Sequence, residues 1–454
     1  METLNLLKSG QLTGQKRLKL ACGLTEFPME ILDLADSLEI LDLSNNHLRT
    51  LPDAFGQLKN LKIAFFNNNQ FEDFPTVLAA CPKLSMISFK GNQITTVTEE
   101  ALSPTIRWLI LTNNQIETLP ASIGNLSTLQ KLMLAGNRLT ALPEEMAACQ
   151  NLELIRLSAN RLQSLPDWLL TLPRLSWLAY AGNPFCETPA AASASLRSLS
   201  TIDADQLAFG EILGQGASGI IYKGRWATAD STHTEAKSVA IKLFKGEITS
   251  DGSPLDEMQA CIAAGAHPNL VTVLGKLANH FDHKADSKAG SKAGLVFSFV
   301  PPDYTNLGGP PDLDTCTRDT YDTDTTFSLA SILTITRGIA SAVAHLHRQG
   351  ILHGDLYAHN ILVNETGASI LGDFGAASFY DPSHSARGQS LERLEVRAFG
   401  CLLEDLLDRC AHPQETASQI AQLRRLQQDC LAPIPTMRPL FNDICETLAD
   451  LTRL

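Results

Sequence analysis

One asparagine recurs at a nearly constant interval through the N-terminal part of this 454-residue chain. The recurring residues are Asn46, Asn69, Asn92, Asn114, Asn137, Asn160 and Asn183, spaced 23, 23, 22, 23, 23 and 23 residues apart. Around them the sequence follows L-x-x-L-x-L-x-x-N-x-L, in which each unit offers one short apolar strand face too small to form a core alone. Such units are stable only when they stack, so the spacing predicts a repeat array with one strand per unit. The asparagine side chains are expected to bind backbone groups of neighbouring coils.

Several units continue with Leu-Pro, namely Leu51-Pro52, Leu119-Pro120, Leu142-Pro143 and Leu165-Pro166. Together with the asparagine pattern, residues 12–186 resemble the leucine-rich repeat family in its short intracellular type. The resemblance implies a curved α/β solenoid with a binding role, although it names no ligand. We assign residues 1–186 to this solenoid.

The positions between the repeated leucines are unusually apolar. Side chains alternate along a strand, so these positions are expected to face outward on the concave sheet. They include Ile40, Ile63, Phe65, Met86, Trp108, Ile110, Met133, Leu154 and Trp177. Strand propensity alone favours apolar residues there, but two tryptophans and two methionines in line indicate an interaction surface. We expect this strip to hold a protein substrate or the chain's own second domain.

The repeat period ends at Cys186, and residues 187–206, rich in Ala and Ser, are interpreted as a linker. The net charge of −13 and the pI of about 5.3 argue against nucleic acid or an anionic membrane surface as a partner. The N-terminus lacks a signal-peptide pattern and no run of about 20 apolar residues is evident, so no membrane span is expected. The ten scattered cysteines form no C-x-x-C pair, which favours a reducing compartment and cytoplasmic residence.

A glycine-rich stretch opens the region from residue 207 to 454. Gly214-Gln215-Gly216-Ala217-Ser218-Gly219 reads G-x-G-x-x-G, and Ile221 follows. Glycines let a backbone approach phosphate groups closely and leave N–H groups able to bind them. Further on, Val239-Ala240-Ile241-Lys242 reads as an apolar strand that ends in a lysine. The expected carboxylate partner of Lys242 is Glu257, on a helical stretch, with Asp256 as its neighbouring competitor.

A second group of polar residues lies within His353-Gly354-Asp355-Leu356-Tyr357-Ala358-His359-Asn360 and Asp373-Phe374-Gly375. Asp355 is placed to accept or orient the proton of a substrate hydroxyl. Asn360 and Asp373 are candidate metal ligands. Phosphoryl transfer needs mainly positioning and neutralisation of charge, so two carboxylates and one amide around Mg²⁺ suffice.

These motifs together resemble the protein-kinase superfamily, and the match runs over residues 207–454. The resemblance implies an α+β bilobal fold with ATP and Mg²⁺ as cofactors. It makes Asp355, Lys242 and Asn360 catalytic and makes Asn360 and Asp373 the metal ligands. The nucleotide-binding residues that it implies are Gly214, Gln215, Gly216, Gly219, Ile221, Ala240, Lys242, Glu257, Ser298, Val300 and Leu362.

The sequence departs from the family pattern in several places. Gly354 stands where arginine is usual, and Tyr357 and His359 replace residues that separate serine/threonine from tyrosine kinases. No Ala-Pro-Glu follows Gly375, and Glu395-Val396-Arg397-Ala398-Phe399-Gly400 arrives early in place of Asp-x-Trp-x-x-Gly. The segment that normally holds a substrate peptide is therefore short. Two polar inserts, 282–294 and 303–326, are expected to be mobile loops.

The sequence thus predicts an ATP-dependent protein kinase that phosphorylates a protein hydroxyl, with serine or threonine as the default acceptor. The repeats would serve substrate docking or autoregulation. One alternative is a catalytically weak kinase-like scaffold, against which the retained Lys242, Asp355, Asn360 and Asp373 argue. The other is a small-molecule phosphotransferase of the aminoglycoside-kinase type, with which His-Gly-Asp and the short segment agree.

Overall fold

The computed structural model describes residues 2–186, 199–227, 236–246, 248–278, 293–383, 385–411 and 417–451. The chain divides into two compact units. The first comprises residues 1–175 and 183–185, and the second comprises residues 176–182 and 186–454. The insert expected at 282–294 lies almost entirely outside the described residues.

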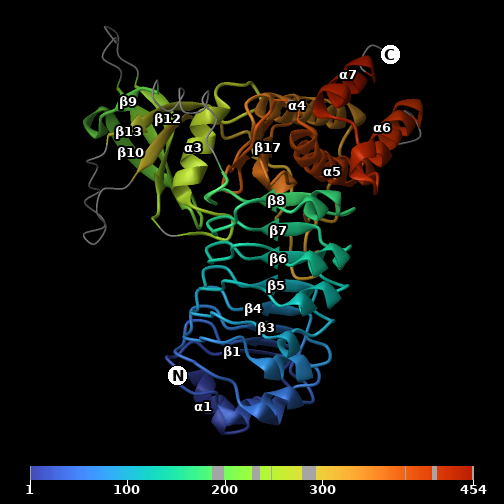
Figure 1. Ribbon diagram of the computed structural model, residues 1–454. Helices are drawn as coiled ribbons and strands as arrows, with labels where there is room; N and C mark the ends of the chain where they lie inside the picture. The colour runs from blue at the N-terminus through green and yellow to red at the C-terminus, as the bar shows by residue number, and fades with distance from the viewer. Residues whose placement is uncertain are drawn as a thin grey trace. The chain divides into compact units, whose positions relative to one another are not determined.

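The first unit is a stack of parallel three-residue strands (Figure 1). After helix α1 (Glu2–Lys8), the strands are β1 (Arg17–Lys19), β2 (Ile40–Asp42), β3 (Ile63–Phe65), β4 (Met86–Ser88), β5 (Trp108–Ile110), β6 (Lys131–Met133) and β7 (Leu154–Arg156). Between them run the 3₁₀ turns η1 (Met29–Leu34), η2 (Asp53–Gln57), η3 (Thr76–Ala80), η4 (Glu99–Ala101), η5 (Ala121–Asn125), η6 (Glu144–Ala148) and η7 (Asp167–Thr171). The strands pair in register, so Ile40 lies opposite Ile63. The predicted solenoid with one strand per repeat is confirmed.

The repeated asparagines bind the turns of adjacent repeats to one another. The Asn69 amide donates to the carbonyl of Leu43 in the preceding repeat at 2.9 Å and to that of Phe66 at 3.1 Å. Its side-chain oxygen accepts from the Leu48 N–H at 3.0 Å. Each buried asparagine thereby satisfies backbone groups that no strand pairs, which explains why the period depends on this residue.

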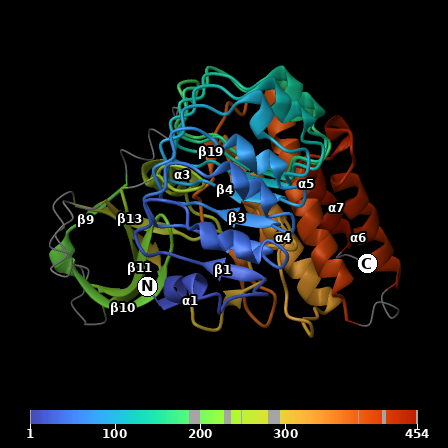
Figure 2. The same cartoon turned by 90° about the horizontal axis from the view of Figure 1, so that it is seen from below.

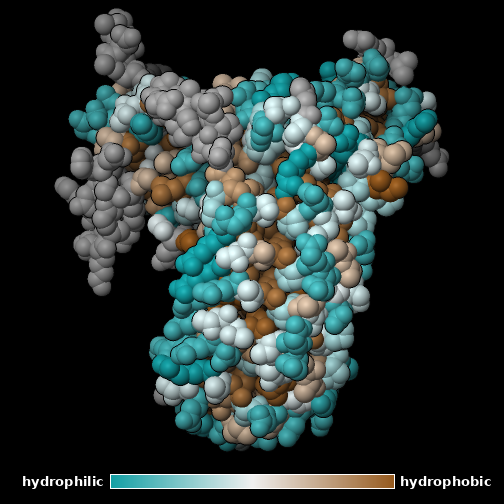
Figure 3. All heavy atoms as spheres, viewed as in Figure 1, coloured by the Kyte–Doolittle hydropathy of each residue, from teal (hydrophilic) through white to brown (hydrophobic). Residues whose placement is uncertain are grey.

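The apolar strip of the repeat strands is only partly open to solvent. Ile40, Ile63, Phe65, Trp108 and Ile110 are half-buried, whereas Met86, Met133, Leu154 and Trp177 are buried. Parallel strands lie about 4.8 Å apart, so long side chains in one column cover their neighbours. Lys131 shows this, with its Nζ 4.2 Å from the ring centre of Trp108. Four of the nine side chains are therefore covered by other side chains, Trp177 by Tyr357. This burial does not contradict the outward-facing positions, and the docking role stays a prediction. Apolar side chains remain visible on the repeat unit in Figure 3.

The second unit begins with a mixed sheet in the order β10-β11-β12-β14-β13-β9. Its strands are β9 (Thr201–Ile202), β10 (Leu207–Gln215), β11 (Gly219–Trp226), β12 (Lys237–Phe244), β13 (Val273–Leu277) and β14 (Gly294–Ser298), and helix α3 (Pro254–Ala264) follows β12. Strand β9 lies within the stretch interpreted as a linker and pairs with β13. The end of that stretch is thus part of the sheet.

The rest of the second unit is mainly helical. Figure 2 shows its long helices together, apart from the sheet. Its elements are α4 (Leu329–Arg348), β16 (Ile351–Leu352), η9 (Ala358–Asn360), β17 (Ile361–Val363), β18 (Ser369–Leu371), β19 (Ser378–Phe379), α5 (Ala386–Asp408), α6 (Ala417–Cys430), η10 (Pro435–Met437) and α7 (Phe441–Leu451). Among the described residues, α4 alone is long and apolar enough to cross a membrane. The search of the sequence for an apolar run of about 20 residues did not find this helix. More than half of its most apolar window, 56%, is buried, as in a core helix.

The second predicted insert, 303–326, is packed rather than mobile. Its strand β15 (Thr305–Asn306) pairs with β17, and its Cys316 and Thr317 are buried. Arg318 donates to Glu404 at 2.7 Å and to Asp405 at 2.6 Å, both on α5. The composition of this segment is typical of a mobile loop. It did not show that the polar residues bind partners far along the chain. The mobile-loop prediction was wrong for this segment.

Candidate active site

The second unit contains a cavity of about 430 Å³. Its lining residues come from the sheet, from α3, from β17 and from the segments that follow β14 and β18. Eight predicted site residues line it: Ile221, Ala240, Lys242, Glu257, Ser298, Val300, Leu362 and Asp373. Sequence reasoning missed other lining residues, including Cys261, Val271 and Tyr304. Most lining residues are apolar, and Lys242, Glu257 and Asp373 add charged groups, a combination that suits a nucleoside and its phosphates.

The charged end of the cavity is formed by Lys242 of β12 and Glu257 of α3. The two side chains form a buried salt bridge, which confirms Glu257 over Asp256 as the partner. Burial acts to lower the pKa of Lys242, but the carboxylates of Glu257 and Asp373 outweigh it and raise the pKa. The ammonium group is therefore charged at neutral pH and held on a rigid strand.

The four predicted glycine-loop residues, Gly214, Gln215, Gly216 and Gly219, lie at the turn between β10 and β11 and do not line this cavity. Gly219 has a clear steric reason to be glycine, because a Cβ there would lie 2.5 Å from the Leu243 carbonyl oxygen. No atom lies within 4 Å of a Cβ placed at Gly214 or Gly216. The turn therefore has open space on one side, which its backbone needs in order to approach a phosphate chain.

Asp355 is held by residues on both sides of it in the sequence. The Asn360 amide donates to the Asp355 carboxylate at 2.7 Å and to its backbone carbonyl at 3.0 Å. His353 Nε2 lies 2.9 Å from the Gly372 carbonyl oxygen, and its Nδ1 accepts from the Asp355 N–H at 3.3 Å. Because a carbonyl only accepts, the His353 proton sits on Nε2. Asn360 thus holds the carboxylate and backbone carbonyl of Asp355, and His353 holds its backbone N–H.

The donor set of Asn360 and Asp373 fits a divalent cation. Both hydrogen bonds that the Asn360 side chain makes to described residues use its nitrogen, so its oxygen is left to face a metal. Asp373 lines the cavity and has φ of +51°, a left-handed conformation that aspartate adopts more readily than most residues. Oxygen ligands of this kind are those that Mg²⁺ prefers.

Two acidic residues that the sequence reading did not assign to the site also hold this loop. Asp319, from the packed insert, accepts from the Ala358 N–H at 2.6 Å and pairs with His359 Nδ1 at 2.6 Å. Burial acts to lower the pKa of His359, but the bond to Asp319 and the carboxylates of Asp355 and Asp373 raise it. Only a structure can reveal Asp319, because its partners lie 39 and 40 residues away.

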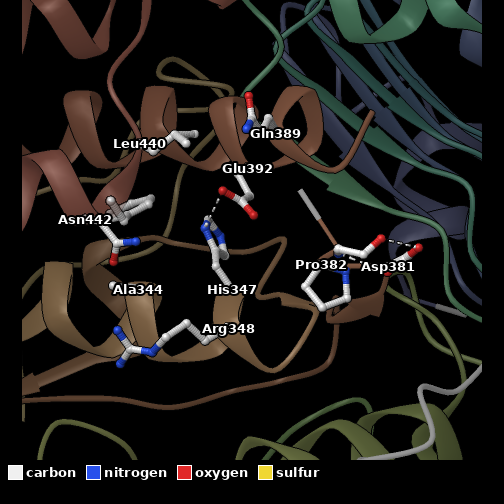
Figure 4. A pocket seen from close by; sticks show the side chains of 11 residues that line it. Ala344, His347, Arg348, Asp381, Pro382, Gln389, Glu392, Leu440 and Asn442 are labelled. Atoms are coloured by element: carbon white, nitrogen blue, oxygen red, sulfur yellow. Dashed lines mark hydrogen bonds and ion pairs between the residues drawn. The ribbon is translucent and has the colours of Figure 1, made fainter. Parts of the chain in front are cut away.

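Glu395 is the second of these residues, and it replaces the aspartate of the family pattern. It is buried and accepts from the Gly354 N–H at 2.5 Å and from His347 Nε2 at 2.7 Å. His347 also lines a separate cavity of about 340 Å³ beside Arg348 and Glu392. Figure 4 shows His347 and Glu392 pointing toward one another there. The early Glu-x-x-x-x-Gly motif is thus tied to the catalytic loop through Gly354.

Two family models match parts of this chain, and several known proteins are similar to it. Residues 207–399 match the family of protein tyrosine and serine/threonine kinases, and residues 36–94 and 127–185 match leucine rich repeats. A probable LIM domain-containing serine/threonine-protein kinase of Dictyostelium discoideum is 23% identical over 55% of this chain and 40% of its own length. Cyclin-dependent kinase 11.1 of Caenorhabditis elegans is 31% identical over 37% of this chain and 21% of its own. A solved leucine-rich repeat protein of Leptospira interrogans is 34% identical, covers 42% of this chain and 48% of its own, and has a TM-score of 0.38.

The chain therefore combines leucine-rich repeats with a protein kinase domain, which confirms the family resemblance and the fold class. It spans less than half the length of the two curated relatives described above.

Proposed function

We propose that this protein is an ATP-dependent protein kinase that transfers a phosphoryl group to a protein hydroxyl. One observation supports the proposal most strongly. The same domain contains the Lys242–Glu257 salt bridge, the hydrogen bond between Asp355 and Asn360, and Asp373 in the lining of the cavity. Lys242 would bind the nucleotide phosphates, and Asp355 would orient the acceptor hydroxyl and take up its proton. A scaffold without activity has no physical need for this set.

ATP would bind in the cavity, with its base between Ile221, Ala240 and Leu362 and its phosphates toward Lys242, all of which line it. Mg²⁺ would be held by Asn360 and Asp373, where it supplies positive charge that offsets the charge on the phosphates. Ser298 ends β14 and Val300 follows two residues later, and the polar atoms of both would face the adenine edge.

We further propose that serine or threonine is the acceptor and that the repeats dock the substrate or regulate the domain. The relative from Dictyostelium discoideum, which is named a serine/threonine kinase, supports the first point. The partly open apolar strip on the repeats supports the second. A remote docking surface would compensate for a short substrate segment, since α5 begins at Ala386, soon after Gly375.

The same short segment favours a second candidate, transfer to a small molecule. Purified protein with labelled ATP and Mg²⁺ should be offered a mixture of unfolded proteins, a set of amino sugars, or no acceptor. We expect label in protein, recovered as phosphoserine or phosphothreonine. Label in an amino sugar alone would replace the proposal with the second candidate, and ATP binding without any transfer would support a scaffold.

A further inference from the structure

The last strand of the repeat pattern belongs to the kinase unit and contacts its catalytic loop. Strand β8 (Trp177–Ala179) lies within residues 176–182, which group with the second unit. The Trp177 indole is 2% exposed and stacks on Tyr357, with ring centres 4.4 Å apart and planes 7° apart. Its Nε1 donates to the Leu356 carbonyl at 3.2 Å. Leu356 and Tyr357 are the two residues that follow Asp355.

The residues after Trp177 bind the segment that follows Asp373-Phe374-Gly375. Ser378 Oγ accepts from the backbone N–H groups of Tyr180 and Ala181 at 3.0 and 3.1 Å. The Tyr180 hydroxyl donates to the Phe379 carbonyl at 3.1 Å. Ser378, Tyr180 and Trp177 are all buried. Residues 177–181 therefore contact both the catalytic loop and the segment that follows Asp373.

Gly354 shows how closely the strand fits the loop. It has φ of +73°, and a Cβ there would lie 2.6 Å from the Ala376 carbonyl oxygen and 2.7 Å from that of Leu178. The backbones of Leu178 in β8 and of Ala376 thus occupy the space that a side chain at position 354 would need. The replacement of the usual arginine by glycine is explained by this contact.

We propose that residues 176–182 hold the catalytic loop in the position needed for transfer, with Trp177 as the positioning residue. The proposal rests on the proposed kinase function. Trp177 does not line the nucleotide cavity, and its contacts to the catalytic loop are with Leu356 and Tyr357, the residues that follow Asp355. Its loss should therefore affect turnover more than ATP binding, because small displacements of a reacting group cost much of the rate.

The first test does not depend on activity. Amide hydrogen exchange across residues 353–363 should be compared in the full chain, in Trp177→Ala and in Trp168→Ala, which removes a half-buried tryptophan of η7 in the first unit. We expect faster exchange in Trp177→Ala alone. Equal exchange in all three proteins would overturn the proposal even if the protein proves to be no kinase.

The second test uses kinetics. We expect kcat to fall about 10- to 100-fold in Trp177→Ala with KM for ATP nearly unchanged, and to recover in part in Trp177→Phe, which keeps the ring stack. If Trp177→Ala fails to fold, Trp177→Phe still tests the proposal. It removes the hydrogen bond to Leu356 and should show a smaller loss of kcat. Full turnover in a folded Trp177→Ala, or a rise in kcat, would contradict a positioning role; a rise would show that the strand restrains the domain.

Discussion

At the scale of single residues, the buried pair of Lys242 and Glu257 makes a prediction about stability as well as activity. Lys242→Met leaves the Glu257 carboxylate buried without its cation, which costs about 3–5 kcal/mol of unfolding free energy. The double variant Lys242→Met with Glu257→Gln removes that charge and should recover much of the loss in urea denaturation. Neither variant should transfer phosphate. A double variant as unstable as the single one would show that the pair matters for packing rather than charge.

The contact between Asp319 and His359 predicts a pH dependence. Because folding raises the pKa of His359, the pair stabilises the fold fully below the unfolded pKa of about 6.5 and loses this effect as pH rises through the folded value. Asp319→Asn should therefore lower the unfolding free energy more at pH 6 than at pH 9, by about 1.5–3 kcal/mol at the lower pH.

The measurement is chemical denaturation in the absence of nucleotide and metal, with the exposed Asp429→Asn of α6 as a control. The same loss at both pH values would mean that Asp319 acts through the Ala358 N–H and not through the charge on His359.

At the scale of elements, the close fit between β8 and the catalytic loop makes a prediction about position 354. A side chain there, including the arginine usual in the family, should destabilise the fold. Gly354→Ala forces a side chain into a positive-φ position and against two carbonyl oxygens. It should lose about 1–3 kcal/mol of unfolding free energy from backbone strain, with a further loss from the clash. Gly354→Arg should be worse still, and both should abolish transfer.

The control for this prediction is Gly265→Ala, which has φ of +66° but no atom within 4 Å of the added Cβ. It should be destabilised by strain alone and keep its activity. Activity retained in Gly354→Arg would show that β8 is easily displaced from the loop.

At the scale of the whole molecule, the features that could be predicted from the sequence are those that depend on short motifs or on a repeat period. The solenoid followed from the asparagine period, and the site followed from Lys242, Asp355, Asn360 and Asp373, because each lies in a local motif. The Lys242–Glu257 pair spans only 15 residues.

What the sequence did not reveal depends on contacts between distant residues. Asp319 and Glu395 reach the catalytic loop from 39 and 41 residues away, and Trp177 reaches it from 179. The insert 303–326 had the composition of a mobile loop, yet Arg318 and Asp319 anchor it. Trp177 matched the outward positions of the repeat pattern, and only the fold shows that Tyr357 covers it.

The central claim is that Asp355 serves phosphoryl transfer, and one comparison tests it most directly. ATP binding and the transfer of labelled phosphate to protein should be measured in parallel for the full chain and for Asp355→Asn. We predict unchanged ATP affinity and transfer at least about 100-fold slower in the variant, because the acceptor hydroxyl loses its base. Equal transfer by both proteins, with ATP bound equally well, would contradict the account.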